Sequence, residues 1–317
     1  MTWNLTPERF AALVADAVRA PSMHNTQPWR FRLSGQAVDV LLNDDRVLLV
    51  GDPAGRAARV AVGAAVFNLR LAMDVDGTAA AVRLWPEPDV IARLTAADAR
   101  PATPAERRLY AAIPRRHSNR DPFADVPVPA DARTGLVRAA HDEGGWLHLA
   151  ESAADAEATA DLIREADRLL RSDTGYLTEL ASWTGVGAHA TEGVPRDAGG
   201  PEPDQYELLT RRDFAGPATA RSFEREPLIA VLGAGGDLAG DQVVAGMALQ
   251  RVLLTATDLG LAASIFTQPI DHPDTRERLR AVCRQPFPPY AVLRLGYGTA
   301  AHRSGRAPLT DVIVPPG

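Results

Sequence analysis

Three arginines and a serine stand within six positions of one another, at Arg115, Arg116, Ser118 and Arg120. Alternate residues of an extended segment share a face, so Arg116, Ser118 and Arg120 would point the same way. Guanidinium groups bind phosphate oxygens through paired hydrogen bonds, and a hydroxyl adds another donor. The segment is therefore a candidate phosphate site, and a solvated basic turn before the next proline is the alternative.

A loop rich in hydrogen-bonding groups lies between Pro21 and Pro28 and is followed by Trp29. It reads Ser22-Met23-His24-Asn25-Thr26-Gln27. Such groups beside a large aromatic side chain suit the edge of a planar, polar heteroaromatic ligand. An Asx-type turn between a helix and a strand would account for Ser22 and Asn25, but not for the whole run.

The composition excludes several other kinds of chemistry. All 34 basic residues are arginines, so Schiff-base chemistry on a lysine and a Walker-type phosphate loop are excluded. The single cysteine, Cys283, excludes an intramolecular disulfide and a cysteine-rich metal site. A net charge of −6 provides no global field that attracts nucleic acid. Because no signal peptide and no membrane-spanning apolar run is recognisable, a cytoplasmic protein without membrane contact is expected.

The 317 residues, 46% of them hydrophobic, suffice for about two domains. Helix start signals at Thr6 and Pro7 predict a first helix to about Arg19. Hydrophobic periodicity predicts further helices at 55–77, 131–140, 153–171 and 241–258. Strands are expected at 29–33, 38–41, 47–50, 82–85, 146–149, 228–232, 261–266 and 290–295. Residues 172–221 show little periodicity, which is typical of a functional lid or a partly disordered segment.

The two long central helices are related in sequence. The segment from Gly63 to Gly77 aligns with that from Gly246 to Gly260, and both pairs of glycines are 14 residues apart. Upstream, Trp29 has a counterpart in Trp146. Two matches in the same order favour two copies of one helix–strand–helix–strand unit over the chance likeness of two amphipathic helices.

These motifs together resemble a known family. The run from Ala20 to Phe31 is similar to the flavin loop of FMN-dependent nitroreductases, and residues 115–120 resemble the arginine-rich element that holds the FMN phosphate in that family. Residues 296–298 and 306–309 resemble its C-terminal strand and tail. The order of the two motifs and the repeated helix are similar to the Acg-type, single-chain, pseudodimeric nitroreductase-like proteins of actinobacteria.

The resemblance implies an α+β nitroreductase-like fold. Two fused repeats would form a pseudodimer with antiparallel-sheet cores and long central helices. The expected division is a first repeat at 1–113 and a second at 114–317, with a lid insertion at about 172–221. The residues before the first helix contain no arginine-rich element, and the loop equivalent in the second half, at 139–145, has lost the motif. One FMN per chain is therefore expected.

The resemblance also assigns residues to the FMN site. The expected cofactor-binding residues are Pro21, Ser22, Asn25, Gln27, Trp29, Arg30, Arg115, Arg116, Ser118, Arg120 and Arg306. No side chain is expected to be catalytic and no metal is expected, because the chemistry belongs to the flavin.

Two functions follow from this resemblance. One is the NAD(P)H-dependent reduction of a small aromatic acceptor, a nitroaromatic compound or a quinone. The other is FMN sequestration, with the lid covering the flavin and little or no turnover. A scaffold without any cofactor would require both motifs to be accidental. The chain is expected to be a monomer or a homodimer.

Overall fold

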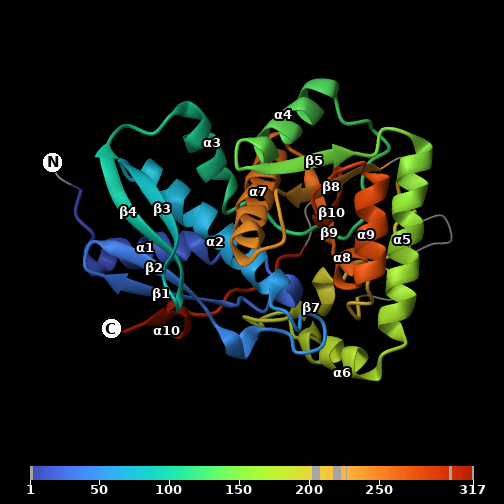
Figure 1. Cartoon of the computed structure of the whole chain (residues 1–317), viewed down its shortest axis with the longest axis horizontal. Helices are drawn as coiled ribbons and strands as arrows, with labels where there is room; N and C mark the ends of the chain where they lie inside the picture. The colour runs from blue at the N-terminus through green and yellow to red at the C-terminus, as the bar shows by residue number, and fades with distance from the viewer. Residues whose placement is uncertain (1–2, 202–207, 217–222, 226, 300–301, 316–317) are drawn as a thin grey trace.

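The computed structural model describes residues 3–201, 208–216, 223–225, 227–299 and 302–315. It has an α+β architecture with two separate, largely antiparallel sheets, one from each half of the chain (Figure 1). The two central helices, α2 (Arg56–Val75) and α7 (Ala239–Asp258), lie side by side between the sheets (Figure 1). The predicted α+β class with antiparallel sheets and long central helices is confirmed, and the division into fused repeats stays a prediction.

The first sheet has the strand order β11-β1-β2-β4-β3. Its members are β1 (Trp29–Ser34), β2 (Ala37–Leu42), β3 (Thr78–Glu87), β4 (Val90–Ala99) and β11 (Ile313–Val314). Only β11 pairs in parallel, with β1, so the end of the chain returns to the first half. Helices α1 (Pro7–Ala17) and α2 pack their apolar faces with this sheet into one core.

The second sheet has the order β5-β8-β10-β9 and is covered on both faces. Its strands are β5 (Gly145–Leu149), β8 (Leu228–Ala234), β9 (Ala262–Phe266) and β10 (Pro289–Gly296). One core contains residues of α4 (Ala130–His141) and α7, and the other contains residues of α5 (Ala153–Arg171), α8 (Gln268–Asp271) and α9 (Pro273–Val282). Burial on both faces explains why all eight residues of β10 are buried.

Two glycines that align in the sequence, one on each central helix, allow the helices to touch. A Cβ atom on Gly63 would lie 2.1 Å from the carbonyl oxygen of Val243, and one on Gly246 would lie 2.0 Å from that of Val60. The amide of Gln250 donates a buried hydrogen bond of 2.7 Å to Asn68. Backbone contact at this crossing therefore requires glycine on both helices.

The structure corrects one expected strand and adds several elements. The strand expected at 47–50 is wrong, because this segment follows a short 3-10 helix (Asp44–Arg46) and forms a turn into α2. In the first half, the unexpected elements include β4 and α3 (Pro104–Ala112). Helix α3 begins with a capping box between Thr103 and Glu106. Residues 90–99 are rich in alanine and show no clear alternation that would predict a strand, whereas the spacing of Thr103 and Glu106 is a helix-start signal.

The predicted lid contains regular structure. It includes α6 (Thr174–Trp183), the short parallel pair β6 (Thr184–Val186) and β7 (Val194–Pro195), and a 3-10 helix (Arg196–Ala198). Residues 202–207 and 217–222 of the expected lid lie outside the described residues.

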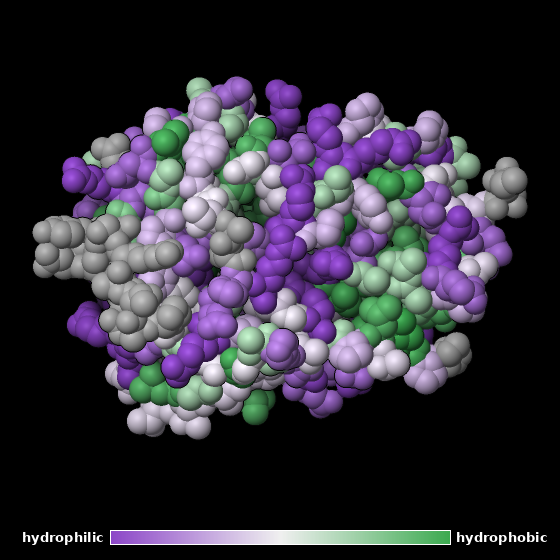
Figure 2. All heavy atoms as spheres, turned by 180° about the vertical axis from the view of Figure 1, so that it is seen from behind, coloured by the Kyte–Doolittle hydropathy of each residue, from purple (hydrophilic) through white to green (hydrophobic). Residues whose placement is uncertain are grey.

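The remaining features concern the C-terminal helix and the surface. A short helix, α10 (Leu309–Val312), precedes β11. Among the described residues, no helix combines the length and the apolar character that crossing a bilayer requires. The face shown in Figure 2 carries a band of hydrophilic residues down its middle, with hydrophobic residues gathered in smaller areas.

Candidate functional site

Two adjoining cavities lie where the motifs from the two halves meet. The larger has a volume of about 350 Å³ and the smaller about 90 Å³. Pro21, Ser22, Ser118 and Arg120 line both cavities. The proline-bounded loop and the arginine-rich segment, almost one hundred residues apart in sequence, are therefore brought together at one site.

The proline-bounded loop has an unusual backbone. His24, Asn25 and Gln27 all have positive φ values, of 50°, 59° and 54°. Each left-handed residue other than glycine costs roughly 1 kcal/mol, so tertiary contacts must hold the loop in place. The Ser22 hydroxyl accepts a hydrogen bond of 2.9 Å from the backbone N–H of Gln27. The Asn25 amide donates to the carbonyl of Gly193 at 3.1 Å.

The smaller cavity is strongly cationic. The described residues that line it include no Asp or Glu, but they include Arg19, Arg116, Arg120, Arg303 and Arg306. Burial, together with the charges of Arg306 and Arg303, lowers the pKa of Arg116 to about 9. Burial likewise lowers the pKa of Arg120 and that of Arg306 to about 10. A buried cluster of one sign is a site for a compensating anion.

The arginines of this cluster have different partners. Arg306 donates to the carbonyls of Val18 and Ala20 at 2.6 and 3.1 Å, just beyond the end of α1. In contrast, the Nε atom of Arg116 is buried without a hydrogen-bond partner among the described residues. Arg120 donates to Ala198 at 2.8 Å. Arg306 therefore positions the loop, while Arg116 keeps a donor for a ligand.

Four predicted site residues line neither cavity. Gln27 is buried and donates to the carbonyl of Thr191 at 2.8 Å. Trp29 is fully buried in the first core, Arg30 pairs with Asp45 at 3.3 Å, and Arg115 is exposed. Gln27 supports the loop from within, and direct contact of these four with a cofactor stays a prediction. The other seven predicted residues line at least one cavity.

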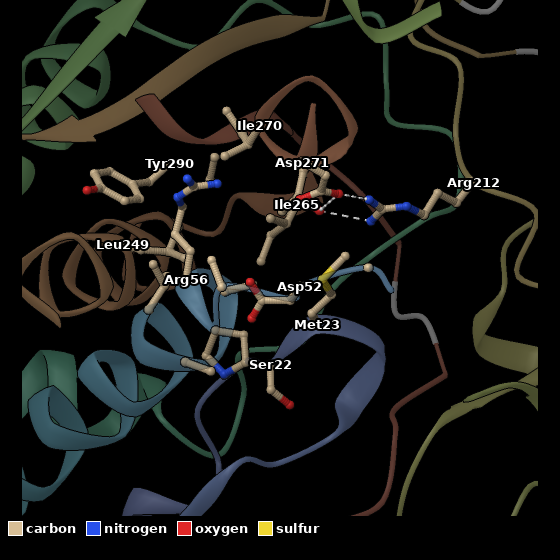
Figure 3. A pocket seen from close by; sticks show the side chains of 18 of the residues that line it. Ser22, Met23, Asp52, Arg56, Arg212, Leu249, Ile265, Ile270, Asp271 and Tyr290 are labelled. Atoms are coloured by element: carbon tan, nitrogen blue, oxygen red, sulfur yellow. Dashed lines mark hydrogen bonds and ion pairs between the residues drawn. The ribbon is translucent and has the colours of Figure 1, made fainter. Parts of the chain in front are cut away.

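The larger cavity combines apolar walls with charged groups. Val60, Ala61, Leu249, Ile265 and Ile270 contribute apolar surface. Four charged residues of its lining were absent from the sequence-based set: Asp52, Arg56, Arg212 and Asp271. Figure 3 shows Arg56 near Tyr290 at one edge of this cavity and Arg212 with Asp271 at the other.

Two of these four residues, Arg212 and Asp271, form a buried hydrogen-bonded pair. The Arg212 and Asp271 side chains are only 6% and 8% exposed, and they are joined by a hydrogen bond (Figure 3). Burial raises the pKa of Asp271 to about 7, although Arg212 opposes this shift. Burial also raises the pKa of Asp52, which accepts a hydrogen bond of 2.8 Å from the backbone N–H of Ala58 in α2.

Of Asp52, Arg212 and Asp271, only Asp52 lies in a recognisable sequence pattern. An Asp followed by Pro before a helical run is a typical helix-start signal, and it could have identified Asp52. Asp271 and Arg212 lie in segments without a local motif, so no sequence pattern placed them at the cavity.

The lid is fastened to the loop and to the turn before α2. Glu192 forms an ion pair with Arg46, and Glu179 accepts a hydrogen bond of 2.7 Å from the backbone N–H of Gly51. Inside this cover, burial and the charges of Arg212 and Arg120 hold the pKa of His24 well below its usual range. His24 is therefore neutral at pH 7 and acts as a hydrogen-bonding or packing group.

Comparisons with known proteins give this site a context. No family model matches the chain. The chain is 33% identical over 309 residues to the Mycobacterium tuberculosis protein named "Putative NAD(P)H nitroreductase Rv3131", across 92% of this chain and 85% of that protein. It is 31% identical over 305 residues to "Putative NAD(P)H nitroreductase acg" of the same organism, across 92% and 90%.

Among solved structures, the FMN and NADPH-dependent nitroreductase NfnB from Sphigopyxis sp. strain HMH matches with a TM-score of 0.43 and 16% identity, across 65% of this chain and 97% of NfnB. The sequence matches are the decisive ones, because they extend over nearly all of the chain. By this relationship, the chain belongs to the Acg-type family of nitroreductase-like proteins.

Proposed function

We propose that this chain binds one FMN and uses it for the NAD(P)H-dependent reduction of a nitroaromatic compound or a quinone. The observation that carries the proposal is the continuity of an arginine-lined cavity with a larger, mainly apolar one. The printed names of the mycobacterial relatives support the nicotinamide-dependent reductase class. In this proposal the phosphate occupies the smaller cavity and the isoalloxazine ring the larger.

The smaller cavity suits a phosphate group. A dianion there would compensate the charges of Arg116, Arg120 and Arg306, whose pKa values are lowered by burial. The partnerless Nε of Arg116 and the hydroxyl of Ser118 are available as donors. Arginine thereby takes the place that lysine has at many phosphate sites.

The larger cavity suits a planar ring with polar edges. Its size lies within the range of small-molecule sites, and the apolar residues of α2, α7 and β9 would contact the ring faces. When bound, FMN would supply the hydride chemistry, and the chain would supply position, electrostatics and exclusion of water. We also propose that residues 1–113 and 114–317 are the two fused repeats, because each half contributes one wall of the site.

The first experiment is an FMN titration followed by anaerobic reduction. We expect one FMN per chain, with the flavin absorbance bleached by NADPH or NADH and by dithionite as the control. A flavin-to-protein ratio near two would contradict the single site, and failure to bind FMN would overturn the proposal.

FMN sequestration is the second candidate, and the lid contacts favour it. Glu192 with Arg46 and Glu179 with Gly51 join the lid to the edges of the site. Replacing both glutamates by glutamine tests this candidate, because it loosens the cover without removing it. Faster bleaching by the nicotinamide in this variant would support sequestration, whereas slower bleaching would support a working active-site cover.

A further inference from the structure

We propose that Asp271 is the acid that delivers a proton to the acceptor bound in the larger cavity, and that Arg212 holds the carboxylate that remains. This inference rests on the proposed reductase function. It assigns a role in the chemistry to one side chain, whereas the other residues of the site bind and orient the cofactor.

The position of Asp271 supports this role. It is the last residue of α8, which follows β9 after Thr267, and its side chain lines the cavity beside Ile270. Figure 3 shows its carboxyl group joined to Arg212 at the edge of the space that Ile265 and Met23 also face. A carboxyl group in this position can reach a ligand without crossing bulk water.

The hydrogen bonds around Asp271 can stabilise its carboxyl group in the ionised form. Arg212 bonds directly to the carboxyl group and donates to the Thr267 hydroxyl at 2.9 Å. That hydroxyl lies 3.3 Å from Asp271 Oδ2. Arg212 also donates to the Tyr176 hydroxyl at 2.8 Å. A fixed guanidinium and a hydroxyl therefore stabilise the ionised carboxylate after it has lost its proton.

The charges that face this pair come from several elements. Asp52, before α2, adds a negative charge that opposes ionisation of Asp271. Arg212 is further influenced by Tyr176 on α6 and Asp167 on α5, and its positive charge helps to keep His24 neutral. Burial and the charge of Asp52 thus outweigh the effect of Arg212, which favours a proton on Asp271 near pH 7.

Two neighbouring groups are less suited to supply the proton. Asp52 is engaged by the first turn of α2, because it accepts from the backbone N–H of Ala58 at 2.8 Å. His24 is neutral and does not line the larger cavity; its ring centroid lies 6.0 Å from that of Phe214. Asp271 therefore lines the cavity and can hold a proton near pH 7, so it is the best placed of the three groups to act as the acid.

The proton balance can be written for a quinone. Conversion to the hydroquinone consumes two electrons and two protons. A hydride, which NAD(P)H provides by way of the reduced cofactor, brings both electrons and one proton and forms the first new bond to hydrogen. The other quinone oxygen takes the second proton from Asp271, whose O–H bond breaks. The resulting carboxylate pairs with Arg212 until water returns a proton.

The test compares Asp271→Asn with Asp74→Asn in FMN-loaded protein. Asp74 is a suitable control because it is also buried and paired with an arginine, Arg100 at 3.2 Å, but lies outside the larger cavity. Acceptor reduction by the unaltered protein should fall as the pH rises through about 7, where Asp271 loses its proton. We expect Asp271→Asn to lose this dependence and to slow reduction by roughly 10²-fold or more. Asp74→Asn should keep both the pH dependence and the rate.

A structural readout accompanies the rates. Infrared spectroscopy should show a protonated carboxyl band that titrates near pH 7 and is missing in Asp271→Asn. If that variant does not fold, Thr267→Val replaces it: loss of the hydroxyl that stabilises the carboxylate should move the band and the rate profile to higher pH.

The outcomes separate the two proposals. If the unaltered protein binds no FMN, the reductase function fails, and the role of Asp271 fails with it. If FMN binds and is reduced but Asp271→Asn keeps the rate and pH profile, only the role of Asp271 is overturned. An unmoved profile in Thr267→Val would have the same meaning.

Discussion

At the residue scale, the main feature of this site is the burial of charged side chains. Arg116 is 8% exposed, and among the described residues it donates to the backbone carbonyl of Arg19 at 3.2 Å. A buried guanidinium without an anion is costly. Binding of a phosphate should therefore depend strongly on this side chain.

The substitution Arg116→Met tests that dependence. It should weaken FMN binding by about 10- to 100-fold, the amount expected for one charge-assisted hydrogen bond. Arg115→Met, at the exposed neighbour, should change it by less than about twofold. The measurement is a fluorescence titration with FMN and with riboflavin, which lacks the phosphate. Equal losses for both ligands would show that Arg116 does not contact the phosphate.

At the element scale, the crossing of α2 and α7 sets the distance between the two halves. The glycines at this crossing leave no room for a side chain, because a Cβ on Gly63 would meet a backbone oxygen of the opposite helix. Both helices also contribute residues to the larger cavity, among them Val60 and Leu249. The width of the cavity thus depends on this packing.

We expect Gly63→Ala to destabilise the fold by roughly 3 kcal/mol, because the two backbones must separate. Its melting temperature should fall by about 5–10 °C. Gly135→Ala is the matched control: Gly135 also lies inside a helix, α4, but a Cβ there meets nothing within 4 Å. It should raise stability by about 1 kcal/mol through helix propensity. A higher melting temperature for Gly63→Ala than for Gly135→Ala would contradict this prediction.

At the scale of the whole molecule, the site is closed by segments from distant parts of the chain. The loop at 21–28, the segment at 115–120, the lid and the tail around Arg306 all meet there. The Arg46–Glu192 pair joins the lid to the first half, and both side chains are about 30% exposed. Such a pair contributes on the order of 0.5–1 kcal/mol.

Loosening that pair should speed the release of FMN. We expect Glu192→Gln to raise the dissociation rate by about 2- to 5-fold, with little change in the melting temperature. Glu157→Gln, which breaks an exposed pair with Arg164 on α5, is the control and should leave the rate unchanged. Stopped-flow fluorescence gives both rates. Equal rates in all three proteins would mean that the Arg46–Glu192 pair does not control release.

Most of the longer helices and strands could be predicted from the sequence, because their signals are local. The expected helix at 153–171 coincides with α5, and the long central helices differ from prediction by only a few residues at their ends. The strand expected at 47–50 failed because a hydrophobic run there forms a turn instead, with Leu49 80% exposed. Short apolar runs are ambiguous when no partner strand is known.

The sequence alone determined the two motifs that meet at the site, the absence of lysine, and the family resemblance. These are properties of short, continuous stretches. The tertiary structure decided that Asp52, Arg212 and Asp271 face one cavity, that Gln27 supports the loop from within, and that Trp29 belongs to the core. Asp52 and Asp271 are more than two hundred residues apart, and their charges are felt only because folding removes the water between them. No local pattern encodes such a pair, since its energy exists only after the two halves have packed.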